Sequence, residues 1–250
     1  MRLIKLPSDT HLRFMKFWKA GFFASTGLSV LAIVLFFMVG LNYGIDFQGG
    51  TLVELQTREG PADIAQMRSD ISDLNLGDVQ IQQFGSPDTV LIRVVRQPGG
   101  EDAQQRAVQL MRDMFGDSVD FRRVEVVGPR VSSELAQAGV IAVAVALLAI
   151  MVYIWLRFEW QFAIGAVITT LHDVLLTVGI FAITQLEFNL STIAAVLTIV
   201  GYSLNDTVVV YDRLRENLRR YKKMPLAELI DLSINQMLSR TIMTSLTTLI

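Results

Sequence analysis

The stretch GYSLNDTVVVYDR, at residues 201–213, places a carboxylate inside an apolar segment. Asp206 is the only charged residue of the run Phe188–Tyr211, which is long enough to cross a membrane as a helix. A carboxylate at membrane depth costs about 2.5–3.5 kcal/mol on insertion scales, so it must bind a proton or find a partner. The sequence therefore predicts that Asp206 is a proton-binding residue.

Arg240 is the predicted partner of this carboxylate, because a further apolar run begins just after it. At 1.5 Å per residue, Asp206 lies roughly 7–8 Å inside the helix end expected at Tyr211, and Arg240 lies at a comparable depth. An ion pair would favour the charged carboxylate and loss of water would disfavour it, so making the contact would release a proton and breaking it would load one. The alternative is that Asp206 only links neighbouring helices, with help from Asn205 and Thr207.

Two more polar residues, His172 and Asp173, lie near the middle of another apolar run. Adjacent residues point about 100° apart on a helix, so we expect them to face different surroundings, one a partner subunit and the other the bundle interior. A secondary proton relay and a structural hydrogen-bonded pair both fit this pattern. Gly201 and Ser203 are small residues for which we expect a role in helix packing.

The elements that position these residues are apolar helices. Hydrophobic residues make up 52% of the 250-residue chain and the mean hydropathy is +0.44, which is typical of a membrane protein. Four runs reach the roughly 20 residues that a span needs, at 20–41, 135–156, 160–186 and 188–211. A fifth begins at about residue 240 and is too short to span by Ile250, so we expect the chain to be truncated within it.

Positive charges predict which side of the membrane each segment faces, because cytoplasmic loops near span ends carry excess Lys and Arg. The segments 1–19 and 212–239 are both basic, whereas 42–134 carries 15 acidic residues, 9 Arg and no Lys. Four spans place both basic segments in the cytoplasm and 42–134 outside. The basic stretch 213–223 is then the cytoplasmic signal, and contact with anionic lipid is its second predicted role.

The outward segment 42–134 has the pattern of a small folded domain. Strand-like runs at 51–57, 79–84, 89–95 and 119–127 alternate with helical periodicity at 61–74 and in the region of residues 107–114. The order β-α-β-β-α-β is that of a ferredoxin-like α+β sandwich. Its acidic surface argues against nucleic acid and favours contact with a protein.

Several classes of enzyme and metal-binding function have no support in the sequence. The chain has no Cys, no HExxH metal motif, no Walker A loop and no nucleophile elbow, so we expect no enzyme activity, no metal and no cofactor. An intramembrane aspartyl protease would need two facing membrane aspartates and a Gly-x-Gly-Asp motif, and that motif is missing.

Four motifs in order resemble the SecF family, the smaller subunits of the SecDF protein-export complex. They are GLNYGIDFQGGTLVEL (40–55), VGP (127–129), HDV (172–174) and GYSLNDTVVVYDRLREN (201–217). The resemblance runs from about residue 14 to the end. It implies an RND-like bundle of six membrane spans with a ferredoxin-like domain inserted after the first, in the bacterial inner membrane.

The resemblance also implies a function. It predicts a subunit that works with SecD, and through it with the SecYEG channel, to pull unfolded secretory proteins outward with the proton-motive force, sodium being an alternative coupling ion. Positions matching Asp206 and Arg240 are associated with proton transport in the family. Gly49 and Gly50 are candidate hinge residues, and the alternative for them is a tight turn of fixed geometry. The rival functions are a proton-coupled small-molecule efflux component of the RND class and a non-transporting scaffold for a translocon.

Overall fold

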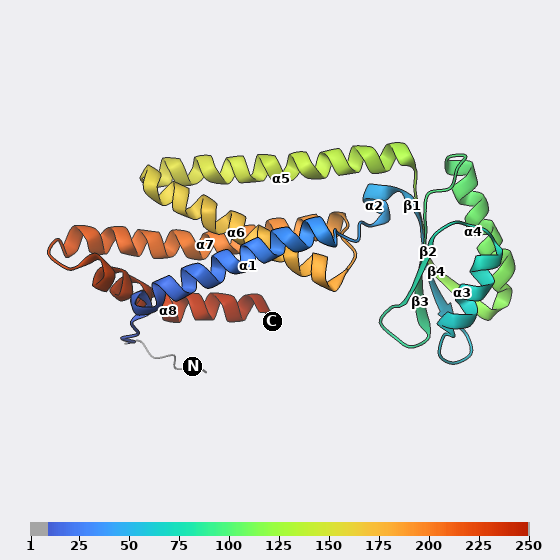
Figure 1. The fold of residues 1–250 in the computed structure, drawn as a ribbon, viewed down its shortest axis with the longest axis horizontal. Coiled ribbons are helices and arrows are strands. Elements are labelled where there is room, and N and C mark those ends of the chain that lie inside the picture. The colour runs from blue at the N-terminus through green and yellow to red at the C-terminus, as the bar shows by residue number, and fades with distance from the viewer. Residues whose placement is uncertain (1–9, 250) are drawn as a thin grey trace. The chain divides into compact units, whose positions relative to one another are not determined.

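The computed structural model describes residues 10–249 and divides into two compact units. One holds most of the long helices and comprises residues 10–41, 146–185 and 194–249; the other holds the sheet and comprises residues 42–145 and 186–193. Figure 1 labels the helices and strands of both.

Four strands form one antiparallel sheet in the order β2-β3-β1-β4. The strands β2 and β3 are the predicted hairpin, and β1 lies between β3 and β4. Helix α3 connects β1 to β2 and helix α4 connects β3 to β4, which confirms the β-α-β-β-α-β order. The bounds are β1 (Gly50–Thr57), α3 (Ile64–Asp73), β2 (Val79–Gln83), β3 (Thr89–Val94), α4 (Glu101–Phe115) and β4 (Val119–Val127).

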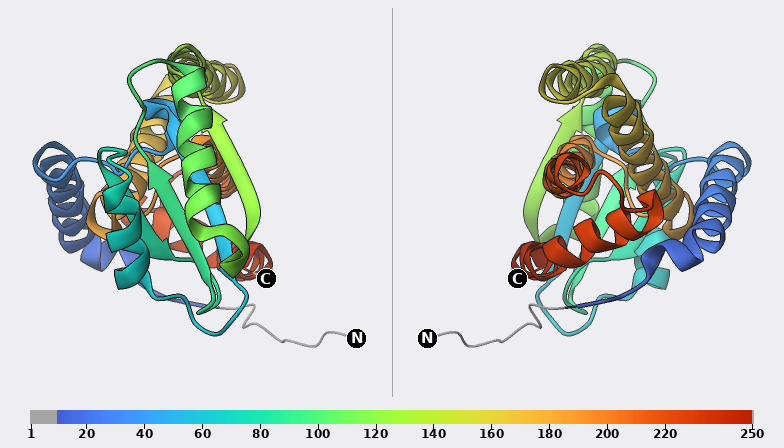
Figure 2. Two further views of the ribbon diagram at one scale, coloured as in Figure 1. Left: turned by 90° about the vertical axis from the view of Figure 1, so that its right-hand side faces the viewer. Right: turned by 90° about the vertical axis from the view of Figure 1, so that its left-hand side faces the viewer.

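Helices α3 and α4 cover one face of this sheet, as Figure 2 shows. Alternate strand residues point to opposite faces, so every second apolar residue of β1 and β3 meets the helices. The core contains Val53, Leu55, Val90, Ile92, Met67, Ile71, Ala107 and Met111. Helix α3 begins at a capping residue, because the Asp63 carboxylate accepts hydrogen bonds from the Ala65 and Gln66 amides, both at 3.0 Å.

The opposite face of the sheet receives the one-turn helix α2 (Ile45–Gln48). Ile45 is buried there against Leu52 and Leu91, with Val127 at the edge of the cluster. The intervening positions of β1 and β3 therefore supply the contact that fixes α2 to the sheet.

Four helices within residues 10–249 are long and apolar enough to cross a membrane, in agreement with the four predicted spans. The first helical stretch contains η1 (Phe14–Phe17) and α1 (Trp18–Met38), and the others are α5 (Pro129–Arg157), α6 (Trp160–Thr184) and α7 (Leu190–Arg220). Many of their apolar side chains are exposed in the isolated chain, as expected for surfaces that meet lipid or a partner subunit.

The segment 212–239, expected as a loop, is mostly helical. Helix α7 continues through Tyr211 to Arg220, and α8 (Leu226–Leu249) begins only six residues later. Charged and polar residues at helical spacing extend a span as readily as apolar ones once the helix has started, so the loss of hydropathy did not mark a helix end. Of the predicted N-terminal segment 1–19, residues 1–9 lie outside the described part.

Within the helical unit, α1 packs along α6. A Cβ atom added to Gly179 would lie 2.6 Å from the Cβ of Ala32, so these two small residues let the helices approach closely. Ser25 and His172, seven residues earlier on each helix, also meet. The end of α5 packs with α6 and α7 around Ile154, Phe158, Ala163 and Ala166.

Candidate functional site

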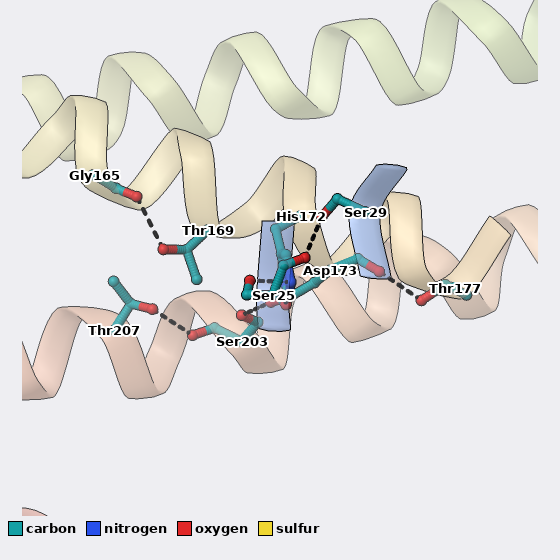
Figure 3. Close-up of polar contacts among 9 residues, drawn as sticks. All are labelled: Ser25, Ser29, Gly165, Thr169, His172, Asp173, Thr177, Ser203 and Thr207. Atoms are coloured by element: carbon teal, nitrogen blue, oxygen red, sulfur yellow. Dashed lines mark hydrogen bonds and ion pairs between the residues drawn. The ribbon is translucent and has the colours of Figure 1, made fainter. Parts of the chain in front are cut away.

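A chain of polar side chains crosses the helical unit at the middle of α6. The Ser25 hydroxyl of α1 lies 2.7 Å from His172 Nε2, and His172 Nδ1 lies 3.1 Å from Asp173 Oδ1. The other Asp173 oxygen accepts a hydrogen bond from the Ser203 hydroxyl of α7 at 2.5 Å. Figure 3 shows these residues between the three helices.

The expectation that His172 and Asp173 serve separate surroundings was wrong in part. Each does reach a different helix, His172 toward α1 and Asp173 toward α7, but the two side chains also contact each other. Their Cα–Cβ bonds diverge as predicted, and rotation about the side-chain bonds brings the imidazole and carboxylate together. Both are half-buried, so each uses its polar atoms on protein partners.

Asp206 lies one turn beyond Ser203 on α7 and faces α8. Its Oδ1 atom lies 3.3 Å from the Thr244 hydroxyl, and the carboxylate is half-buried. An open groove of about 410 Å³ lies beside it between α7 and α8. Hydroxyl and amide side chains contribute to its lining together with apolar ones: Thr198, Ile199, Tyr202, Ser203, Asn205, Thr244, Ser245 and Thr248.

The predicted ion pair between Asp206 and Arg240 is absent from this structure. Among the ion pairs of residues 10–249 none joins these two, and the Arg240 side chain is exposed. Thr244, one turn further along α8, takes its place beside the carboxylate. A hydroxyl satisfies a half-buried carboxylate without the desolvation that a guanidinium would require.

Ser203 connects the two polar regions. It donates to Asp173 and also lines the groove that holds Asp206. Its small size predicts a packing role, and its spacing of three residues from Asp206 is the signal for a shared helix face. Ser25 and Thr244 were not predicted, since no local pattern distinguishes them from other hydroxyl residues of apolar helices.

Gly49, which follows α2, and Gly50, the first residue of β1, adopt backbone conformations that other residues avoid. Gly49 has φ +73° and its amide donates to the Ile45 carbonyl at 2.8 Å, while Gly50 has φ +129°. A Cβ atom on Gly50 would lie 2.5 Å from the Val94 carbonyl oxygen. The pair forms a tight turn here, and movement about Gly49 and Gly50 stays a prediction.

Comparison with known proteins bears directly on these motifs. Residues 107–250, more than half of the chain, match the family described as "Protein export membrane protein SecD/SecF, C-terminal". Residues 34–60 match the "SecD/SecF GG Motif", which contains the glycine turn. The chain belongs to the SecD/SecF family.

Relatives within the SecD/SecF family cover almost the whole chain. It is 48% identical to "Protein translocase subunit SecDF" of Brucella abortus over 99% of its own length and 33% of that protein. It is 44% identical to "Protein translocase subunit SecF" of Rickettsia bellii over 98% of its length and 81% of that protein.

The crystal structure of SecDF, a translocon-associated membrane protein, from Thermus thermophilus matches the whole chain with a TM-score of 0.87 at 35% identity. The matched region is 34% of that protein. No group of three or more His, Asp or Glu side chains within residues 10–249 is arranged to hold a metal ion.

Proposed function

We propose that this chain is a SecF-type subunit that assists Sec-dependent protein export and uses a proton gradient through proton transfer at Asp206. The observation that carries the proposal is the position of Asp206, half-buried in an apolar helix beside a groove that several hydroxyl side chains help to line. Moving one charge through the membrane potential is worth about 2.3 kcal/mol per 100 mV, so a single carboxylate is a sufficient coupling group.

Thr244 supplies chemistry suited to either state of this carboxylate. Its hydroxyl lies 3.3 Å from Asp206 and 2.9 Å from the carbonyl oxygen of Arg240, and it has one proton to donate. Toward a charged Asp206 the hydroxyl donates its proton. Toward a protonated Asp206 it accepts, and donates to the Arg240 carbonyl instead. Approach of the Arg240 guanidinium to the carboxylate then belongs to another conformation of α8.

The polar chain from Ser25 to Ser203 supports a secondary relay through His172 and Asp173. Hydroxyl, imidazole and carboxylate groups all exchange protons, and Ser203 brings this chain to the groove of Asp206. The same contacts also fit a purely structural connection of α1, α6 and α7. The Asp173→Asn variant described below distinguishes a proton relay from a structural connection.

Partners and location follow from the relatives. The names SecDF and SecF of similar proteins support assembly with SecD, and through it with the SecYEG channel and unfolded secretory proteins. The four apolar helices and the basic charge of segments 1–19 and 212–239 support a place in the bacterial inner membrane with the N-terminus inside. Protons are the proposed coupling ion, with sodium as the alternative.

The test uses the full-length protein with SecD in inverted membrane vesicles. We expect Asp206→Asn to assemble normally and to lose the part of secretory protein translocation that depends on the proton gradient, because the amide cannot bind and release a proton. Immunoblotting of the assembled complex is the control. Normal gradient-dependent translocation by Asp206→Asn would contradict the proposal.

Asp173→Asn is the matched variant for the relay. Asn keeps an oxygen that accepts from Ser203 and cannot carry a proton in the same way. Loss of gradient dependence in a stably assembled Asp173→Asn complex supports the relay. Full activity of this variant assigns His172 and Asp173 to the structural connection and leaves Asp206 as the proton site.

A further inference from the structure

Two segments far apart in the sequence are joined within the sheet-containing unit. Residues 42–47 follow α1, and residues 186–190 connect α6 to α7. The Phe188 amide donates to the Asn42 carbonyl and the Gly44 amide donates to the Phe188 carbonyl, both at 2.8 Å. Tyr43 and Phe188 are partners in this parallel bridge. We call these two paired segments the loop clamp.

Asp46 adds the contact that reaches α7. Its Oδ2 atom accepts a hydrogen bond from the Leu190 amide at 2.9 Å. Leu190 is the first residue of α7, where the amides lack partners inside the helix and the helix dipole favours a negative charge. Asn189 caps the same end from within by accepting from the Thr192 amide at 3.0 Å. Asp46 is therefore a second cap, supplied from another part of the chain.

Side chains pack the loop clamp tightly. The rings of Tyr43, Phe47 and Phe188 contact one another, with centroids 6.0–6.2 Å apart. A Cβ atom on Gly139 of α5 would lie 2.7 Å from Ile193 Cδ1 and 3.8 Å from Phe47. The first turn of α7 is thus held from two sides.

The loop clamp is also attached to the sheet. The Arg93 guanidinium of β3 donates to the Asn42 side chain at 2.8 Å. Asp46 itself lies on α2, whose Ile45 is buried against Leu52 and Leu91 and which leads through Gly49 and Gly50 directly into β1. The domain and the first turn of α7 accordingly form one compact unit, residues 42–145 with 186–193.

Helix α7 then runs without a break from Leu190 to Arg220, and Asp206 is 16 residues from its start. At 1.5 Å per residue this is about 24 Å of continuous helix. A displacement of the first turn is transmitted along a rigid helix, whereas a frayed first turn would absorb it.

We propose that Asp46 is a positioning residue that transmits movement between the outer domain and α7, the helix that carries Asp206. The inference rests on the proposed function, because it assigns the mechanical connection between proton binding and the domain. It predicts that loss of the Asp46 cap uncouples proton binding at Asp206 from the outer domain, while the proton-binding residue and the folded domain both remain.

Three variants test this in the full-length protein assembled with SecD. Asp46→Ala removes the acceptor for the Leu190 amide, and Asp46→Asn keeps an oxygen acceptor. Asp63→Ala is the control, because the Asp63 carboxylate also caps a helix of the same domain, α3, and α3 does not lead to Asp206. Hydrogen exchange of residues 190–193 and gradient-dependent translocation in inverted vesicles are measured for each.

We expect Asp46→Ala to speed exchange in the first turn of α7 by about 2- to 30-fold, the effect of losing a helix cap. Gradient-dependent translocation should fall by a comparable factor of about 2 to 30. Asp46→Asn and Asp63→Ala should retain translocation within about twofold of wild type, since each keeps the cap of α7.

Two results would overturn the proposal. One is faster exchange at residues 190–193 in Asp46→Ala with unchanged translocation, which makes the cap structural only. The other is an equal loss of translocation in Asp63→Ala, which makes the effect one of general domain stability. Failure of the proposed function is distinguished by Asp206→Asn, because that failure leaves the exchange result for Asp46 intact.

Discussion

Glu187 lies in the loop between α6 and α7, outside the membrane-crossing helices. Its carboxyl is half-buried, and burial raises its pKa above the ordinary value of 4.5. Arg93 lowers the same pKa, while Asp46 and Glu125 raise it and Arg123 lowers it. The loop clamp therefore holds a carboxyl group that is more stable in its neutral form than it would be in water.

The free energy of unfolding of the loop clamp should consequently depend on pH. A carboxyl group with a raised folded-state pKa contributes stability that is fully present below its unfolded pKa and is lost as the pH rises through the folded pKa. Glu187→Gln, which is always neutral, should therefore unfold at a higher temperature than wild type at pH 8, with a smaller difference at pH 4. Thermal unfolding of the detergent-solubilised chain at both pH values measures this. Glu59→Gln, at an exposed position, is the control, and an equal difference at both pH values would argue against the assignment.

The contacts of Asp206 show what the sequence can and cannot predict for a single residue. Hydropathy was enough to single out this carboxylate and Arg240, because charges in an apolar run are rare. It was not enough to choose between Arg240 and Thr244 as the contact of Asp206, since both lie on one face of α8 one turn apart. Side-chain exposure decides such a choice, and exposure is a property of the packed helices.

At the scale of elements, the turn between α2 and β1 depends on glycine for two separate reasons. Gly50 combines a positive φ with a close approach to the Val94 carbonyl, whereas Gly60 has φ +73° and open space around it. Gly50→Ala should therefore lower the free energy of unfolding of the domain by about 2–5 kcal/mol, from backbone strain plus overpacking. Gly60→Ala should cost only about 1–2 kcal/mol, the strain alone.

Pulse proteolysis in urea measures both losses in the full chain. Equal losses for the two variants would show that the contact with Val94 contributes nothing. A Gly50→Ala chain that still exports protein would also indicate that Gly50 is not an essential hinge.

At the scale of the whole molecule, the absence of Cys makes the predicted orientation directly testable. Gln105 is exposed on α4 of the sheet-containing unit and Lys222 is exposed in the turn between α7 and α8. In intact cells, an impermeant maleimide should label Gln105→Cys after passage of the outer membrane and should label Lys222→Cys only after lysis. The cysteine-free chain is the control for background. Labelling of Lys222→Cys from outside would reverse the proposed topology.

The sequence alone determined the four spans, the ferredoxin-like order of strands and helices, the SecD/SecF motifs and the candidate carboxylates. These features follow from hydropathy, periodicity and residue type, which are local properties of the chain. Only the tertiary structure decided that Asp206 contacts Thr244, that Ser203 joins Asp173 to the groove, and that Asp46 caps a helix 144 residues away. Such contacts depend on which faces of distant helices meet and on how side chains rotate within the packing, and neither is encoded in local spacing.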